Sequence, residues 1–347
     1  MSQPVKRINL ALQGGGAHGA FTWGVLDRLL ADPGIDIAAI SGTSAGALNG
    51  AALKAGMALD GRDGGRANLR WLWTQISGVG DLRATSQVFP VLPGWQAFSD
   101  QIDDLLPISP AEWASRLFSP YALGPWYRNP LAGIVGQLHL AHVQADAAPL
   151  LFVSATNVRT GKIRVFSGAE ISTDVILASA CLPTLFQAVE ITDPKTGITD
   201  AFWDGGYAGN PALFPLYGKT LPDDIVIVNI NPILRDAVPR TTNDIQNRIN
   251  EISFNASLLA DLRAVAFVKK LLATGAVAAG SMKDVLVHMI ADDDLMNRLS
   301  ASSKVSASPA LLEELMEAGQ TAADRFLADH RDDLNHQGTV DLAAMYS

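Results

Sequence analysis

A glycine-flanked serine constrains the fold of this chain more than any other feature of the sequence. The motif Gly42-Thr43-Ser44-Ala45-Gly46 follows an apolar run at residues 37–40 and precedes small helix-forming residues that extend to residue 55. A strand that turns sharply into a helix at a serine is a nucleophile elbow, in which the backbone of the serine is strained. Side chains at Gly42 and Gly46 would block the close approach of the helix to the strand. The motif predicts Ser44 as a nucleophile, although an ordinary serine N-cap has the same pattern.

A second glycine cluster lies nearer to the N-terminus. The expected strand Ile8–Leu12 leads into Gln13-Gly14-Gly15-Gly16-Ala17-His18-Gly19, after which apolar residues recur at helical spacing. Glycines between a strand and a helix present backbone N–H groups to negative charge, so we expect an oxyanion hole for Ser44 from Gly14, Gly15 and Gly16. The Gly-x-Gly-x-x-Gly spacing that ends at Gly19 also matches a dinucleotide-binding fingerprint, but no acidic residue closes the next strand as that fingerprint requires. We favour the oxyanion hole, because it unites both motifs in one site.

A serine nucleophile needs a base that accepts its proton, and in most hydrolases with this motif the base is a histidine. None of the downstream histidines stands in a glycine-punctuated loop of the expected kind; they are His139, His142, His288, His330 and His336. Asp204 is a better candidate, because it follows an apolar segment and precedes Gly205 and Gly206 on a turn. A carboxylate within hydrogen-bonding reach can take the serine proton directly, but Asp-Gly is also a common turn signal.

The composition limits the kinds of binding partner and the cellular compartment that we expect for this protein. With 35 acidic and 26 basic residues, the chain has a net charge of -9, which argues against a nucleic-acid partner. Cys181 is the single cysteine, so no intrachain disulfide can form, which suits a reducing compartment. We see neither a signal peptide ahead of the first strand nor an apolar run of about 18 residues. These observations predict a cytoplasmic protein, for which peripheral contact with a membrane or lipid surface stays open.

The 347 residues alternate between expected strands and helices, which predicts an α/β fold with a mainly parallel sheet. Residues 57–148 change character, and we expect a helical or irregular insertion there. Within it, residues 61–66 predict a loop, and residues 86–135 are rich in proline and aromatic side chains that fit a lid, an acyl-binding wall or plain packing. Further along, apolar residues at helical spacing predict an amphipathic helix through Ile245, Ile249, Ile252, Ala256, Leu259 and Leu262.

Three ordered blocks together resemble the patatin-like phospholipase family: residues 14–19, residues 42–46 and Asp204-Gly205-Gly206. The segment Ala178–Pro183 is similar to a further block of that family. Three short segments look like its bacterial branch; they are Pro120-Tyr121, Asn129-Pro130-Leu131 and Phe254–Leu258. Position 18 departs from the pattern, since the family often carries arginine or lysine where this chain has His18. That departure puts a strict preference for anionic phospholipid head groups in doubt.

The resemblance implies a single domain over residues 1–347, built as a three-layer sandwich with helices on both sides of the sheet. It implies a Ser44–Asp204 dyad, an oxyanion hole from the backbone of residues 14–16, and neither a metal nor a cofactor. The implied activity is hydrolysis of fatty acyl esters of lipids through an acyl-enzyme. Alternatives with the same dyad are acyl transfer and hydrolysis of intracellular storage lipids or polyesters. A catalytically silent lipid-binding module and a nucleotide-binding protein are weaker alternatives, and the motifs leave the oligomeric state open.

Overall fold

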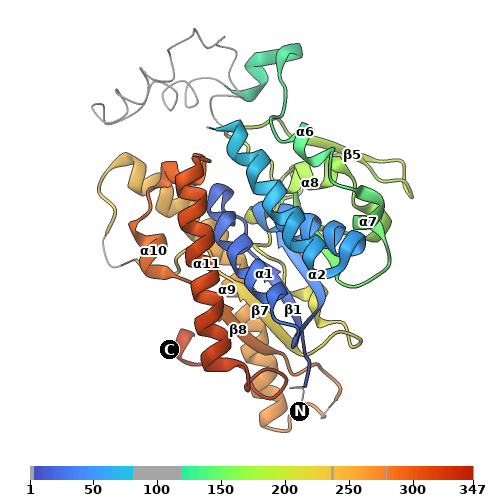
Figure 1. Cartoon of the computed structure of the whole chain (residues 1–347), viewed down its shortest axis with the longest axis vertical. Coiled ribbons are helices and arrows are strands. Elements are labelled where there is room, and N and C mark those ends of the chain that lie inside the picture. Colours follow the sequence, from blue (N-terminus) through green and yellow to red (C-terminus); the bar gives the residue numbers. More distant parts are fainter. Residues whose placement is uncertain (1–3, 81–118, 236–237, 279, 347) are drawn as a thin grey trace.

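The computed structural model describes residues 4–80, 119–235, 238–278 and 280–346 (Figure 1). The described residues form an eight-stranded sheet in the order β5-β6-β3-β2-β1-β7-β8, with β4 paired to β3. Neighbours from β3 to β8 in this order are parallel, whereas β4 and β6 pair with β3, and β5 with β6, in antiparallel fashion. The strands are β1 (Lys6–Leu12), β2 (Ile35–Thr43), β3 (Leu150–Asn157), β4 (Ile163–Ser167), β5 (Val189–Thr192), β6 (Thr199–Asp204), β7 (Asp224–Val228) and β8 (Leu286–Ile290).

Helices cover both faces of the sheet (Figure 1). The longer ones are α1 (Gly19–Ala31), α2 (Ala45–Val79), α9 (Thr242–Ala273) and α11 (Pro309–His330). Shorter ones are α6 (Ala132–Val135), α7 (Leu140–Gln144), α8 (Thr173–Ser179) and α10 (Asp293–Arg298). Among the 3₁₀ turns, η1 (Gly16–His18), η4 (Gly205–Tyr207) and η6 (Ala301–Lys304) contain residues of the motifs or of the candidate site.

Alternating side chains of the central strands build a separate core on each face. On β7, Val226 and Val228 join the cluster with α1, α2 and α11, whereas Ile225 and Ile227 join the cluster with α9. This is the expected result for a strand buried on both sides, since successive side chains point to opposite faces. The predicted three-layer α/β architecture with a mainly parallel sheet is confirmed.

The predicted loop at residues 61–66 is wrong, because α2 continues through it to Val79. The helix has a kink at Asp60 and Gly61, whose backbone angles are not helical. Beyond the kink the chain runs back along the first half of α2, and the Asn68 side chain donates to the Ala52 carbonyl at 2.6 Å. Gly56 and Gly64 face each other so closely that a Cβ on either would overlap the other's carbonyl. The glycines that suggested a loop therefore permit close packing of two helical segments. Residues 81–118 of the expected insertion lie outside the described residues.

The amphipathic helix expected around residues 245–262 is present as the first part of α9, but the N-terminal part of its apolar stripe faces solvent, and Leu262 at its other end is buried in the core. Ile245, Ile249 and Ile252 are 43%, 53% and 55% exposed. The opposite side of the helix is buried instead and contains Glu251, Phe254 and Leu258. The periodicity identified the helix correctly, whereas its orientation follows from the polar and aromatic contacts of the inner side.

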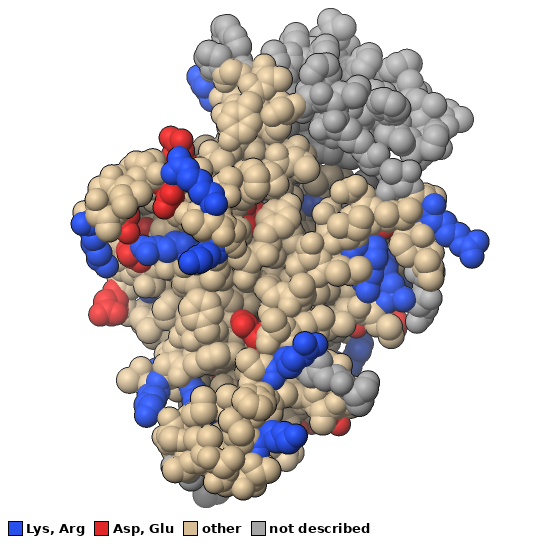
Figure 2. All heavy atoms as spheres, turned by 180° about the vertical axis from the view of Figure 1, so that it is seen from behind, with Lys and Arg blue, Asp and Glu red and all other residues tan. Residues whose placement is uncertain are grey.

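Charged side chains do not gather into an area of one sign on the face shown in Figure 2, where uncharged residues cover most of the surface. Among the described helices, none has both the length and the apolar character needed to span a membrane.

Candidate active site

The register of the sheet brings the two ends of the predicted dyad to one edge. Strand β2 ends at Thr43, which pairs with Ser154 of β3. The next residue of β3, Ala155, pairs with Asp204 at the end of β6. Ser44 and Asp204 therefore follow strands that are separated by a single strand, at the carboxyl edge of the parallel sheet. This edge is where open α/β sheets bind their ligands.

Ser44 lies in a strained turn between β2 and α2. Its φ of 54° and ψ of -120° put a non-glycine residue in a region that L-amino acids rarely adopt. The turn is tight, since a Cβ on Gly42 would lie 2.6 Å from the carbonyl oxygen of Gly46 and one on Gly46 would overlap the Leu12 carbonyl. This geometry is that of a nucleophile elbow, with Ser44 itself 6% exposed.

The Asp204 carboxyl is completely buried. Its Oδ1 accepts the Gly206 N–H at 2.8 Å, and burial raises its pKa to about 7, against the lowering effects of that bond and of the Ser44 hydroxyl. Oδ2 of Asp204 forms no hydrogen bond with any described residue. One carboxyl oxygen is therefore held by the backbone, and the other can accept a proton.

The end of α8 and the residues after it connect the two members of the predicted dyad. The Ser44 N–H donates to Ser179 Oγ at 2.9 Å, and the Asp204 N–H donates to the Cys181 carbonyl at 2.8 Å. Ser179 and Cys181 belong to the block Ala178–Pro183, which the sequence singled out as similar to the family without giving these residues a role. Both are fully buried, so they fix the backbone of Ser44 and Asp204 relative to each other.

The glycine loop after β1 lies directly against Ser44. A Cβ on Gly14 would be 2.6 Å from the Ser44 Cβ, so only glycine fits there. The Gly14 N–H is already used, because it donates to Asn210 Oδ1 at 2.6 Å. The N–H groups of Gly15 and Gly16 donate no hydrogen bond to any residue that the structure describes. Of the three predicted oxyanion donors, Gly15 and Gly16 are free to serve, and Gly14 is not.

Polar side chains at the ends of β1 and β7 hold this loop, and the sequence reasoning missed them. Gln13 Oε1 accepts the backbone N–H groups of Ile230 and Asn231, at 2.9 and 3.0 Å. Asn231 Nδ2 donates to the Gly14 carbonyl at 2.7 Å. The signal was available, because buried parallel strands that end in Gln or Asn place those amides at the edge where a site forms.

A small apolar pocket opens beside Ser44, with a cavity volume of about 40 Å³. The residues that line the pocket come from distant parts of the described chain. They are Gly16, Ala17, Ser44, Ala45, Leu48, Trp73, Ile76, Leu131, Ala180, Leu182, Leu185, Phe186, Lys304, Val305 and Ala307. Apolar walls around a single reactive hydroxyl suit a hydrocarbon chain attached to an ester.

His18, where the sequence departs from the family pattern, is buried and neutral. Its Nε2 is 2.7 Å from Ser303 Oγ. The Ser303 hydroxyl donates its proton to the Ser300 carbonyl at 2.6 Å, so Nε2 of His18 must be the protonated nitrogen. Burial, together with the charges of Lys304 and Arg235, lowers the pKa of His18 to about 3. His18 thus carries no charge near the glycine loop at neutral pH.

None of the side-chain hydrogen bonds or ion pairs that the other histidines make with described residues involves Ser44 or Asp204. His288 Nε2 lies 3.0 Å from Asp224 Oδ1, and this pair joins β7 and β8. His330 pairs with Asp333 at the end of α11, and its side chain is 41% exposed. His139 and His142 flank or belong to α7. In the described part of the chain, no three His, Cys, Asp or Glu side chains are grouped so as to hold a metal ion.

Comparison with known proteins agrees with the motifs. The family model described as patatin-like phospholipase matches residues 10–217, which include both Ser44 and Asp204. A search of curated proteins found no significant match. Among solved structures, the chain is similar to VipD from Legionella pneumophila, with 16% sequence identity, a TM-score of 0.43, and coverage of 95% of this chain and 68% of that one. Because the family model spans more than half of its length, the chain belongs to the patatin-like phospholipase family.

Proposed function

We propose that this protein is a serine acyl hydrolase that cleaves fatty acyl esters of lipids with a Ser44–Asp204 dyad. Family membership supports lipid acyl hydrolysis at the level of the family. The observation that carries the proposal is the pairing of a strained serine with a buried carboxyl whose pKa is raised to about 7, beside an apolar pocket. Such a carboxyl is a much stronger base near neutral pH than an exposed aspartate with an ordinary pKa.

In the first step, the Ser44 oxygen attacks the ester carbonyl while its proton passes to Oδ2 of Asp204. This transfer requires the Ser44 hydroxyl to donate to Oδ2 once the ester is bound, and catalytic hydrogen bonds commonly tighten in that complex. The carbonyl oxygen becomes an oxyanion, which the N–H groups of Gly15 and Gly16 stabilise. The intermediate then collapses to an acyl-Ser44 ester, and the departing alcohol or lysolipid takes the proton from Asp204.

In the second step, Asp204 accepts a proton from water, and the resulting hydroxide attacks the acyl-Ser44 carbonyl. Collapse of this second intermediate releases the fatty acid, and the proton on Asp204 returns to Ser44. The acyl carbons next to the ester lie against the apolar walls of the pocket in both steps, so the carbonyl stays beside the same donors. If an alcohol takes the place of water, the same steps give acyl transfer.

Substitution of the dyad tests the proposal on a medium-chain nitrophenyl ester. We expect Ser44→Ala and Asp204→Asn to lose at least about 10³-fold in kcat, since nucleophile and base act as a unit. His330→Gln is the control, because this exposed histidine is far along the chain from the dyad and should leave kcat unchanged. Full activity of Ser44→Ala, or loss of activity in His330→Gln, would contradict the dyad. Adding an alcohol acceptor during the assay separates hydrolysis from acyl transfer, because transfer produces a new ester.

A further inference from the structure

A segment near the C-terminal end of the chain crosses the glycine loop. We call residues 303–307 the strap. Ser303 contacts His18, the carbonyl of Lys304 lies against Gly16, and the Ala307 N–H donates to the Gly80 carbonyl at 3.3 Å. Lys304, Val305 and Ala307 also line the pocket beside Ser44. The strap lies beyond residue 217, where the family match ends.

Lys304 is linked to the glycine loop in two ways, through its main-chain carbonyl and through its side-chain ammonium. Its main-chain carbonyl packs on Gly16 so closely that a Cβ on Gly16 would overlap it. Its ammonium donates to Asn231 Oδ1 at 3.2 Å, and Asn231 Nδ2 donates in turn to the Gly14 carbonyl at 2.7 Å. A chain of direct contacts therefore leads from one lysine to the peptide groups on either side of Gly15.

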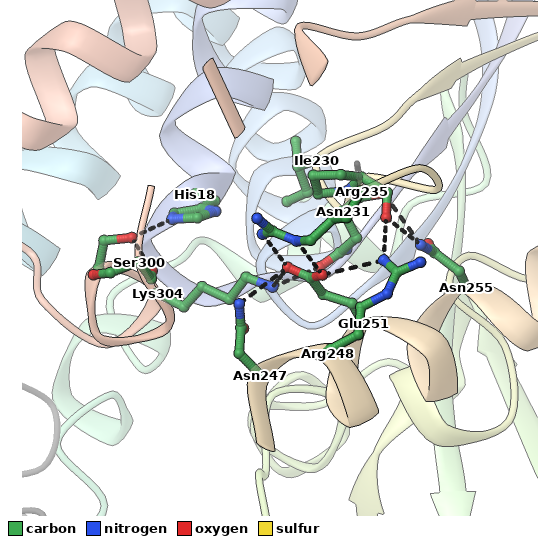
Figure 3. Close-up of polar contacts among 12 residues, drawn as sticks. His18, Ile230, Asn231, Arg235, Asn247, Arg248, Glu251, Asn255, Ser300 and Lys304 are labelled. Atoms are coloured by element: carbon green, nitrogen blue, oxygen red, sulfur yellow. Dashed lines mark hydrogen bonds and ion pairs between the residues drawn. The ribbon is translucent and has the colours of Figure 1, made fainter. Parts of the chain in front are cut away.

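The Lys304 ammonium is itself fixed by a buried carboxylate. Glu251 on the inner side of α9 has a fully buried side chain and forms ion pairs with three cations, as Figure 3 shows. The nitrogens of Arg235, Arg248 and Lys304 lie 2.7, 3.3 and 3.5 Å from its oxygens. Breaking a buried pair of this kind is costly, because it leaves an uncompensated charge. The cluster consequently holds Lys304 in a single position.

We propose that Lys304 is a positioning residue for the oxyanion hole, which acts through Asn231 and its own carbonyl to keep the Gly15 and Gly16 N–H groups aimed at the reacting carbonyl. This inference rests on the proposed function. It assigns a role in that reaction to a residue outside the part of the chain that the family model matches. The surplus positive charge of the Glu251 cluster also favours negative charge in the neighbouring loop.

The role predicts a specific kinetic signature. The oxyanion exists in the transition state and not in the bound ester, so donors that are misaligned weaken the transition state alone. Removal of the Lys304 ammonium leaves the backbone of the strap and the apolar walls in place. We therefore expect kcat to fall while KM for the ester stays the same.

The test compares Lys304→Met with Lys283→Met in the full-length chain, on the nitrophenyl ester. Lys283 is also a largely buried lysine, but it donates to the carbonyls of Leu216, Gly218 and Leu221, near the starts of β7 and β8 and away from the site. We expect Lys304→Met to lose about 10- to 100-fold in kcat, as a misplacement of about 1 Å can cause, with KM within about twofold. Lys283→Met should lower the melting temperature and leave kcat unchanged, and Lys304→Arg should restore part of kcat.

A second variant tests the next link, and it decides the matter if Lys304→Met does not fold. Asn231→Asp keeps an oxygen for Lys304 but removes the N–H that the Gly14 carbonyl accepts. It should give the same loss of kcat at constant KM. The double variant with Lys304→Met should lose little more than either single one, because both act through one contact chain.

Three results would overturn the role of Lys304: wild-type kcat in Lys304→Met or Asn231→Asp, an equal loss of kcat in Lys283→Met, or a rise in KM at constant kcat. The last would make the strap a pocket wall only. A wild-type protein without esterase activity, or activity that survives Ser44→Ala, refutes the proposed function instead, so the two failures can be told apart.

Discussion

At the scale of single residues, the environment of Asp204 determines what the site can do. Burial also raises the pKa of Cys181 and of Tyr207 to about 12, and the charge of Asp204 adds to both shifts. All three groups therefore experience the same apolar surroundings, in which ionisation is costly. The N–H of Gly206 offsets part of this cost, so the carboxyl ionises near neutral pH rather than staying protonated.

The pH dependence of activity follows from this pKa. Asp204 must be ionised to accept the Ser44 proton, so kcat/KM should rise tenfold per pH unit below about 7 and level off above it. Initial rates on the nitrophenyl ester from pH 5 to 9 measure the profile. A midpoint near 4, the ordinary value for aspartate, would show that the base is not a buried carboxyl.

Much of the candidate site could be predicted at this scale, because strained turns and close approaches require particular residue types. Gly42, Gly46 and Gly14 sit where a Cβ would collide with the backbone or with Ser44. Asn210 and Ser179 could not be found in the same way. They act through hydrogen bonds across 196 and 135 residues of chain, and neither contact leaves a local pattern in the sequence.

At the scale of elements, α1 and α11 cross at two glycines. A Cβ on Gly319 of α11 would overlap the Phe21 carbonyl of α1, and one on Gly24 of α1 would overlap the Met316 carbonyl of α11. The two helices can approach this closely only because both positions lack a side chain. The crossing therefore holds α1, the helix that follows the glycine loop, against α11.

The crossing reverses the usual effect of replacing glycine by alanine. Within a helix this change normally stabilises by about 0.5–1 kcal/mol. Gly319→Ala should instead destabilise by about 1–3 kcal/mol, as overpacking does. Gly78→Ala in α2 is the matched control and should stabilise slightly, because no described atom lies within 4 Å of its added Cβ. Chemical unfolding curves measure both, and a stabilised Gly319→Ala would show that the helices do not meet as described.

Helical periodicity identified α9, but it could not tell which side of the helix is buried. The apolar stripe through Ile249 looks like a core face in the sequence, while the side that is buried carries a glutamate. Glu251 becomes tolerable inside because Arg235, Arg248 and Lys304 surround it. Two of these three partners are distant in sequence, so local pattern alone favours the wrong face.

At the scale of the whole molecule, the site draws on chain segments that are far apart in sequence. Strand β1 pairs with β2 on one side and with β7 on the other. The family match over residues 10–217 contains the end of β1 and the whole of β2, while β7, α9 and the strap follow it. Alternation of strands and helices predicted the parallel sheet, because each such unit has a restricted topology. It could not predict that the C-terminal third would supply contacts to the glycine loop.

The proposed dyad requires Ser44 to be a reactive nucleophile, and a fluorophosphonate probe tests this requirement most directly. Peptide mass spectrometry after treatment should find the label on Ser44, and Asp204→Asn should label far more slowly, because the hydroxyl then lacks its base. A label on another serine, or a protein that stays unlabelled, would contradict the Ser44–Asp204 dyad.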